Sequence, residues 1–281
     1  QTCALPILKR GWVLKDNGKI VGFLGIIATY FQLAKEKKLI FNGTTWVVAE
    51  KYRGEPSLDL MLAFIDYTKE SMLFDITSTG YVSEIKEKLG FKRIYSKEGI
   101  RVYYLIIDPQ DILQNLFSSY WFSKNTLKLF NPIIRLYRYL VTHIINQSKE
   151  FYDVKQIDSA DNSFDYLWEE KKSSFDNTNV RTSEVIRWYC SKIGANTNIL
   201  FGCYSNKKLL GYMVCKTEDS LGTIKRKVTI MDIWGPIKDD KFILSMIRKS
   251  LTFSIENNYH AVFFPVFSIE LEKVFKRFFL N

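Results

Sequence analysis

The sequence predicts a fold of the α/β (α+β) class that is built from two tandem units. One observation is the stretch of residues 45–67, where an apolar run, a turn and an amphipathic pattern follow one another as strand, turn and helix. The other is a pattern at residues 17–24 that returns at residues 206–213, with the same order of elements after it. The chain has 281 residues, of which 47% are hydrophobic, so it can bury a core, and this composition argues against disorder.

The stretch 45–67 begins with a short apolar run, Trp46, Val47, Val48 and Ala49, which predicts a buried strand. Turn-forming residues at 52–56 end this strand. The helix that follows is predicted by apolar residues at i, i+3, i+4 and i+7, namely Leu58, Met61, Leu62 and Ile65. Pro56 suits a first helical position, because the amide that proline lacks has no intrahelical acceptor there. The amides at such a helix N-terminus bind phosphates, so the stretch is either a phosphate-binding joint or an ordinary strand-to-helix connection.

The elements on either side of this stretch have a recognisable order. Upstream, residues 12–14 and 19–27 predict a hairpin around the turn pair Asn17-Gly18. Downstream come a strand at 72–76, a polar break with Gly80, and a helix that closes on Leu-Gly-Phe at 89–91. With Arg53-Gly54 at the start of a Q/R-x-x-G-x-G/A turn, the order over residues 11–107 resembles the GNAT (N-acetyltransferase) superfamily.

This resemblance implies that each unit is a mixed, mostly antiparallel sheet flanked by helices. It also implies an acyl-CoA-dependent N-acyltransferase, with acetyl-CoA or another acyl-CoA as co-substrate. The pantetheine arm would lie along a splayed central strand and the diphosphate on the turn that follows it. The residues that the resemblance assigns to acyl-CoA binding are Trp46, Val47, Val48, Arg53, Gly54 and Ser57.

The resemblance also implies a catalytic base and, in some members, an acid. Glu50 is the carboxylate nearest to the predicted central strand and the first candidate for the base, with Glu55 as the second. The tyrosine that the superfamily places just before Leu-Gly-Phe is missing, and Lys86 stands there. Tyr81 lies a few residues earlier and is the remaining catalytic candidate. An ordinary exposed position is the alternative for each of these side chains.

The turn departs from the superfamily's pattern at two positions. Pro56 stands where the pattern has its second glycine, and Leu58 stands where it has glycine or alanine. A proline removes one donor amide, and losing one hydrogen bond to a charged group costs about 1.5–3 kcal/mol. The alternative to an enzyme is therefore a non-catalytic GNAT-like binding or assembly protein that has lost coenzyme A binding.

The second copy of the pattern supports the duplication. After residues 206–213 the sequence predicts a strand at 228–234, a break at Gly235-Pro236, and a helix with Asp240 as N-cap. This helix has an apolar stripe and ends at Asn257-Asn258; the stripe consists of Ile243, Met246, Ile247 and Leu251. A strand at 261–267 and a helix at 269–278 follow. The second copy has no R-x-x-G turn, so we expect it to serve as a scaffold or as an acceptor-side wall without binding coenzyme A.

Three segments follow from these assignments. We expect a first GNAT-like unit at 8–110 that lacks its first strand and helices, a helical linker at 111–149, and a second unit at 150–281 that lacks its last strands. The chain is thus expected to be a fragment. Residues 1–7 read like a translated sequencing adapter and are left out of the fold prediction.

Two further segments have alternative interpretations. Residues 112–147 combine aromatic and basic side chains in two predicted helices, which indicates either interdomain packing or a weak contact with a membrane surface. Residues 181–189 resemble a helix of tandem GNAT-like proteins encoded beside bacterial polysaccharide genes. That resemblance places Arg187 and Trp188 near a substrate pocket, whereas the alternative is that Trp188 belongs to the core.

Charge and cysteine content limit the remaining functional classes to which the protein could belong. A net charge of +10 favours anionic partners, or else reflects solvated lysines. No zinc-finger or recognition-helix motif supports a nucleic-acid binder. Four cysteines without CxxC spacing and two distant histidines predict no metal site and a cytoplasmic location. The apolar run at 20–31 is shorter than the roughly 20 residues of a membrane span, so no transmembrane segment is expected. The resemblance to the GNAT superfamily further implies that the acceptor is an amine of a small molecule, an amino sugar or a cell-wall or polysaccharide precursor, and that the transferred group is not an aminoacyl group.

Overall fold

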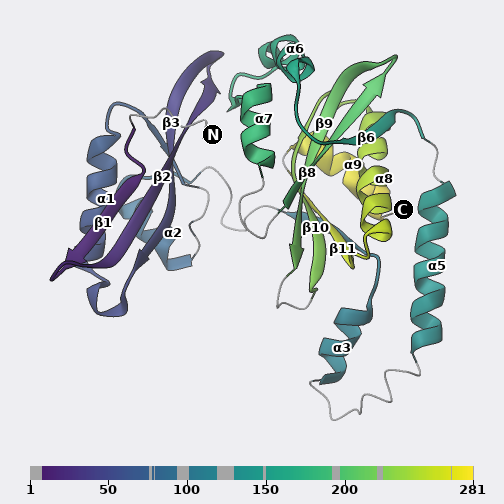
Figure 1. Cartoon of the computed structure of the whole chain (residues 1–281), viewed down its shortest axis with the longest axis horizontal. Helices are drawn as coiled ribbons and strands as arrows, with labels where there is room; N and C mark the ends of the chain where they lie inside the picture. Colours follow the sequence, from purple (N-terminus) through teal and green to yellow (C-terminus); the bar gives the residue numbers. More distant parts are fainter. Residues whose placement is uncertain are drawn as a thin grey trace. The chain divides into compact units, whose positions relative to one another are not determined.

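The computed structural model describes residues 8–75, 78, 80–93, 101–118, 130–147, 150–191, 197–219, 224–266 and 268–280. The chain divides into two compact units, one formed by residues 1–94 and 168–188 and the other by residues 95–167 and 189–281 (Figure 1). Each unit contains a mixed sheet with helices against it, which confirms the predicted fold class. Residues 1–7, which the sequence suggests are foreign, lie outside the described residues.

The sheet of the first unit has the strand order β1-β2-β3-β4, with β7 paired to β2. Its strands are β1 (Gly11–Asp16), β2 (Lys19–Leu33), β3 (Glu36–Val48), β4 (Met72–Phe74) and β7 (Thr178–Asn179). β3 and β4 run parallel, and the connection between them contains η1 (Glu50–Tyr52) and α1 (Glu55–Tyr67). α2 (Gly80–Lys88) follows β4. The strand, turn and helix that the sequence predicts at 45–67 are therefore present, and the predicted strand end at Ile76 lies outside the described residues.

Two hairpin turns organise the first three strands. Asn17 and Gly18 turn between β1 and β2 with φ values of 47° and 81°, as the Asn-Gly pair predicts. Ala34 and Lys35 turn between β2 and β3 with φ values of 48° and 68°, and neither residue type signals a turn. Their amides are held from outside the hairpin, because Lys35 N–H donates to the Asp176 carbonyl at 3.0 Å and Ala34 N–H to an Asn177 side chain at 3.0 Å.

The core of the first unit lies between α1 and the sheet. Leu24, Ile26 and Phe41 of the sheet pack with three buried residues of α1, which are Leu60, Met61 and Phe64. The predicted apolar stripe of this helix is therefore wrong in part, because Leu62 is 50% exposed and Leu60 and Phe64 face the sheet instead. Both sets of positions are compatible with a helical period, and packing against the sheet selects between them.

The sheet of the second unit has the order β5-β11-β10-β9-β8-β6. Its strands are β5 (Val102–Ile106), β6 (Asp153–Ile157), β8 (Thr197–Ser205), β9 (Lys208–Asp219), β10 (Arg226–Trp234) and β11 (Ala261–Pro265). β10 and β11 are parallel and the other neighbours are antiparallel. The remaining helices are α3 (Gln110–Ser118), α5 (Asn131–Gln147), α6 (Asn162–Lys171), η2 (Lys172–Ser174), α7 (Ser183–Cys190), α8 (Asp240–Glu256) and α9 (Ile269–Leu280).

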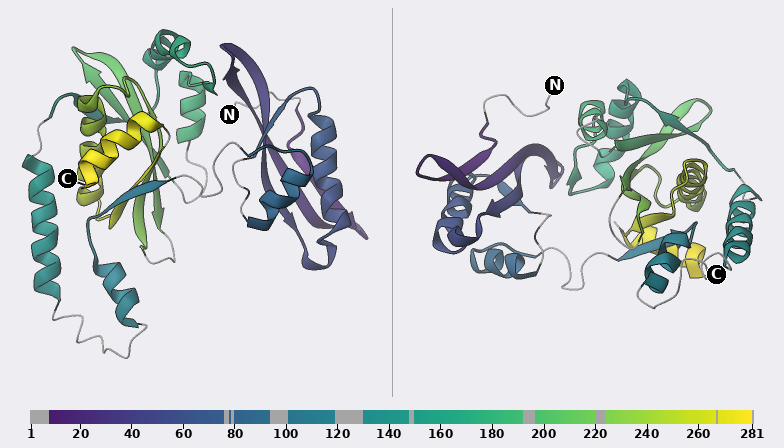
Figure 2. Two further views of the ribbon diagram at one scale, coloured as in Figure 1. Left: turned by 180° about the vertical axis from the view of Figure 1, so that it is seen from behind. Right: turned by 60° about the horizontal axis from the view of Figure 1, so that its bottom comes forward.

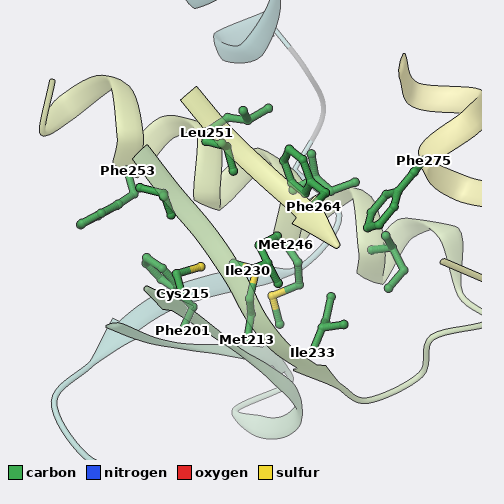
Figure 3. Packing of buried hydrophobic residues seen from close by; sticks show 14 of the residues in the cluster. Phe201, Met213, Cys215, Ile230, Ile233, Met246, Leu251, Phe253, Phe264 and Phe275 are labelled. Atoms are coloured by element: carbon green, nitrogen blue, oxygen red, sulfur yellow. The ribbon is translucent and has the colours of Figure 1, made fainter. Parts of the chain in front are cut away.

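The largest core of the molecule lies in this second sheet and its helices. The predicted stripe of α8 is fully buried against the strands, and Figure 3 shows Met246 and Leu251 among Phe201, Met213 and Phe264. The Asn257-Asn258 helix end is confirmed, with Asn257 as C-cap and Asn258 at a φ of 57°. The predicted N-cap is off by one residue, because Asp239 rather than Asp240 accepts a hydrogen bond from the Lys241 amide.

Strand β5 belongs to the second sheet, although the sequence places it in the first unit. Leu105 pairs with Val262 and Tyr103 with Phe264, so β5 covers the edge of β11 (Figure 2). The predicted boundary at residue 110 therefore falls after the observed division at residue 94, and the segment 168–188 lies with the first unit rather than the second. Pairing across the edge satisfies backbone groups of β11 that would otherwise face water, and a sequence pattern does not reveal such a partner.

The two units contain the same order of elements after their first hairpins. In the first unit the order is hairpin, β3, α1, β4 and α2, and in the second it is hairpin, β10, α8, β11 and α9. The hairpin of the second unit, between β8 and β9, turns at Asn206 and Lys207, with φ values of 48° and 65°. In both units the strand before the long helix and the strand after it are parallel.

The segment 112–147 is described at residues 112–118 and 130–147, which lie in α3 and α5. α5 packs against α8 through Ile145, and the predicted break at Pro132 falls at the first turn of α5. Within the described part of the chain, no helix is both long enough and apolar enough to traverse a lipid bilayer.

The placement of β5 can be tested with proline. Ile107 N–H donates to the His260 carbonyl at 2.8 Å, so strand alternation turns Leu105 N–H toward β11 and Tyr104 N–H away from it. We expect Leu105→Pro to lower the free energy of unfolding by about 1–3 kcal/mol more than Leu105→Ala, because only the proline removes a ladder hydrogen bond. Tyr104→Pro should cost less, since its N–H lies on the open edge. Urea unfolding of the three variants measures this, and equal losses for Leu105→Pro and Leu105→Ala would show that β5 is not paired.

Candidate functional site

In the first unit, the described pairing between β3 and β4 is short. β4 pairs with β3 only at Ile40, Phe41 and Asn42. Over the rest of its length, to Val48, β3 has only β2 as a partner in the part of the chain that the structure describes. The register of β2 and β3 shifts near this point, and Thr45 has a φ of 52°. An extra residue of this kind bends a strand, and the bend in β3 lies just beyond Asn42, where its described pairing with β4 ends.

A cavity of about 120 Å³ lies beside this part of β3. Its polar wall consists of Thr44 and Trp46 from β3, Asp75 and Ser78 after β4, and Lys86 from α2. Leu24, Met61 and Val82 supply apolar surface. Gly43 is also part of the wall, and a Cβ there would lie 3.0 Å from the Phe64 ring and 3.2 Å from an Asp75 oxygen. Glycine therefore allows Asp75 to approach β3 closely.

The cavity wall contains a buried ion pair. The Lys86 ammonium donates to Asp75 Oδ2 and to Ser78 Oγ, the latter at 2.6 Å. Ser78 donates in turn to Asp75 Oδ1, from its hydroxyl at 2.8 Å and from its amide at 3.0 Å. The side chains of Lys86 and Asp75 are each 6% exposed. A lysine this buried needs such acceptors, because an unpaired ammonium away from water is costly.

Trp46 forms the side of the cavity opposite this cluster. The Lys86 ammonium lies 5.6 Å from the centre of its ring, within the range of a cation–π interaction. Trp46 Nε1 is buried and has no hydrogen-bond acceptor among the described residues. Buried donors of this kind nearly always have a partner in a complete complex, so an acceptor atom of a ligand would suit this position.

The turn after β3 leaves a helix N-terminus accessible. Gly54 has a φ of 125°, which disfavours other residues, and a Cβ built there meets no atom within 4 Å. α1 begins at Glu55 with no side chain capping it, and the helical hydrogen bonds begin when Leu58 N–H donates to the Gly54 carbonyl at 3.1 Å. The amides of Glu55 and Ser57 precede that bond and have no intrahelical acceptor. Pro56, at the second helical position, contributes none.

The corresponding turn of the second unit is filled by protein atoms. Gly235 has a φ of 148°, and a Cβ there would lie 2.7 Å from the Phe242 ring. The same ring lies 2.6 Å from a Cβ built on Gly211, and Phe242 is fully buried. The N-terminus of α8 is capped by Asp239. An anion would have to displace both of these groups to reach the helix amides.

The structure separates the residues that the sequence assigns to acyl-CoA binding. Trp46 lines the cavity, whereas Val47 is 61% exposed and Val48 is 8% exposed in the core. Arg53 and Gly54 are exposed on the turn and Ser57 is half-buried in the first turn of α1.

The other candidate residues lie away from the cavity wall. Glu50 is exposed in η1, and Tyr81 is 75% exposed on α2. Glu55, the second candidate base, is exposed at the start of α1. Arg187 is exposed on α7 and donates to Ser183 Oγ at 3.2 Å, and Trp188 is half-buried beside it. None of these five residues is part of the cavity wall.

Sequence reasoning missed the cluster of Asp75, Ser78 and Lys86. Lys86 stood out only as the residue in place of an expected tyrosine, and the signal that could have pointed to it is a lysine on the helix face that precedes Leu-Gly-Phe. Asp75 directly follows a strand, where polar residues often gather at a site.

The cysteines and possible metal ligands do not form a competing site. Burial raises the pKa of the Cys190 thiol to about 11 and that of Cys203 to about 12, so neither is a ready thiolate at neutral pH. No group of three or more potential ligands gathers around a metal position among the described residues.

Solved structures provide a comparison for the fold. The chain is similar to a GCN5-related N-acetyltransferase from Anabaena variabilis, with a TM-score of 0.56 and 12% identity over 92% of this chain and 57% of that one. It is also similar to Saccharomyces cerevisiae N-myristoyltransferase with bound myristoyl-CoA, with a TM-score of 0.61 and 8% identity over 97% of this chain and 64% of that one. This chain thus spans less than two thirds of either protein. No protein-family model and no curated protein sequence matches it. At these identities the similarity shows the GNAT-type fold.

Proposed function

We propose that this protein is an acyl-CoA-dependent N-acyltransferase whose acyl-transfer site lies in the first unit. The observation that carries the proposal is the cavity beside β3, where residues 43–48 have no strand partner on the β4 side among the described residues, in a sheet whose next helix, α1, begins uncapped. The fold shared with N-acetyltransferases and N-myristoyltransferase supports the same activity. The acyl-CoA thioester is the activated donor, and the acceptor is an amine of a small molecule.

The strand β3 and the turn after it would hold the donor. Residues 43–48 have no strand partner on the β4 side among the described residues, so their backbone groups can pair with the amides of a pantetheine arm, as an added strand would. The diphosphate would lie at the N-terminus of α1, near the amides of Gly54 and Ser57 and the exposed guanidinium of Arg53. The Trp46 indole N–H, which has no acceptor among the described residues, would supply a further donor toward the thioester end.

The size of the cavity favours a short acyl group. Its volume of about 120 Å³ is well below the roughly 300–1,000 Å³ typical of pockets for drug-sized ligands. An acetyl group or a similarly short chain fits this space, so acetyl-CoA is the proposed donor.

The remaining roles concern proton transfer and the acceptor. Glu50, which follows β3, is the proposed base that takes a proton from the acceptor ammonium through water, and Tyr81 is a second candidate for proton transfer. Both side chains are exposed, so they would act outside the cavity wall. Arg187 and Trp188 remain candidates for the acceptor side. An amino sugar or a cell-wall or polysaccharide precursor is the proposed acceptor class, in a cytoplasmic setting.

One specific observation favours a second candidate function. Pro56 removes a donor amide from the first turn of α1, and Glu55 places a carboxylate there. Both weaken the binding of a diphosphate. A GNAT-like binding or assembly protein that no longer uses coenzyme A is therefore the alternative.

Measurement of acetyl-CoA binding by calorimetry or thermal shift distinguishes the two candidate functions. We expect Arg53→Ala to weaken binding about 10- to 100-fold, the equivalent of one charged hydrogen bond of about 1.5–3 kcal/mol. The matched control is Lys238→Ala, which removes the same charge from the exposed turn before α8 and should leave the affinity within about twofold of wild type. If the wild-type protein shows no binding at millimolar acetyl-CoA, the enzyme is excluded and the alternative function stands.

A further inference from the structure

The buried pair of Lys86 and Asp75 lies in the cavity wall rather than in the sealed core. A buried ion pair contributes little net stability, because desolvation of both charges offsets their attraction. Two apolar side chains of similar size would serve the packing of α2 at least as well. The position of this pair, at the place where the described pairing of β3 and β4 ends, therefore calls for a role in which a fixed positive charge is needed.

The ammonium of Lys86 has one N–H group without a hydrogen-bond acceptor among the described residues. It has three N–H groups, and two acceptors, Asp75 and Ser78, are found for them among the described residues. Ser78 is itself tied to Asp75, so the ammonium is held from two sides and needs little rearrangement to act. The apolar side chains of Leu24, Met61 and Val82 surround the same space, and a low local polarity strengthens any interaction with a charge there.

We propose that the Lys86 ammonium binds the negative charge that develops on the thioester during acyl transfer, with Asp75 and Ser78 as positioning residues. This inference rests on the proposed function. The acceptor nitrogen forms a bond to the carbonyl carbon, and the carbonyl electron pair moves onto oxygen. The electron pair on oxygen then re-forms the carbonyl, the carbon–sulfur bond breaks, and its electron pair leaves with sulfur as a thiolate. The thiolate takes up one proton from solvent, and the acceptor nitrogen releases one. Lys86 stays protonated and stabilises the charge on oxygen and then on sulfur.

The leaving group gives a test that does not require the acceptor to be known. A fixed ammonium near sulfur favours the thiolate form of coenzyme A, so the affinity for coenzyme A should rise with pH through the titration of its thiol. Desulfo-coenzyme A lacks that thiol and is the matched ligand. Between about pH 7 and about pH 9, the range around a free thiol's pKa of roughly 8.5, we expect the affinity ratio of the two ligands to rise several-fold in the wild type. In Lys86→Met the ratio should not change.

Titration calorimetry measures the ratio of the two affinities. If Lys86→Met fails to fold, Lys86→Gln replaces it, because glutamine retains a neutral hydrogen-bond donor. A second measurement is the hydrolysis of acetyl-CoA, monitored through the release of free thiol. In Lys86→Met its kcat should fall about 10²- to 10³-fold with a smaller change in KM, which is the usual loss for one such donor. Added ethylammonium should restore part of the rate to Lys86→Ala. A ratio that rises equally in wild type and variant would overturn the role of Lys86 and leave the proposed function intact. A wild type that binds neither ligand would overturn both.

Discussion

The bend in β3 at Thr45 is the constraint on which the candidate site depends. Parallel pairing stops at Asn42, and the bend is fixed by Thr45, a non-glycine residue at a φ of 52°. Such a conformation costs about 1–3 kcal/mol and persists only when the surrounding structure enforces it. Among the described residues, the edge of β3 beyond this point has no strand partner on the β4 side, so water or a ligand would have to satisfy its backbone groups.

The two units show how one order of elements can keep or lose such a site. Each has a strand, a turn with a glycine at positive φ, and a long helix. In the second unit the Phe242 ring packs on Gly235 and Gly211, and Asp239 caps the helix. In the first unit Gly54 faces open space and α1 has no side-chain cap. Burying an aromatic ring and adding a cap both stabilise the second unit, whereas the first unit leaves the same groups available. The two units therefore differ in whether protein atoms fill the turn and the helix start or leave them accessible.

Sequence patterns correctly predicted the elements that are determined by residues nearby in the sequence. The Asn-Gly turn, the buried stripe of α8 and the end of that helix at Asn257 all follow from nearby residues. The turn at Ala34 and Lys35 does not, because its amides are held by residues about 140 positions away in sequence. The partner of β5 and the buried face of α1 also depend on tertiary packing, which a single sequence does not specify.

The candidate site could be predicted only in part, because most of its contacts also depend on tertiary packing. Trp46 could be placed on the central strand from its apolar neighbours, and it does line the cavity. The meeting of Asp75 with Lys86 depends on the angle at which α2 returns to the end of β4, and on the absence of a side chain at Gly43.

Gly43 links the geometry of the strand to the charge in the cavity. A side chain at this position would begin 3.2 Å from an Asp75 oxygen and 3.0 Å from Phe64, so any larger residue would push the carboxylate or the core away from β3. Glycine weakens a strand, because it has the most conformational freedom to lose and no side chain to pack. A weakened strand, a strained Thr45 and a desolvated ion pair therefore occur together within one small region of an otherwise well-packed sheet. Each is unfavourable for folding alone, and what they have in common is that they shape and charge the same cavity. This concentration of unfavourable features is typical of a functional site and is difficult to explain by the needs of folding.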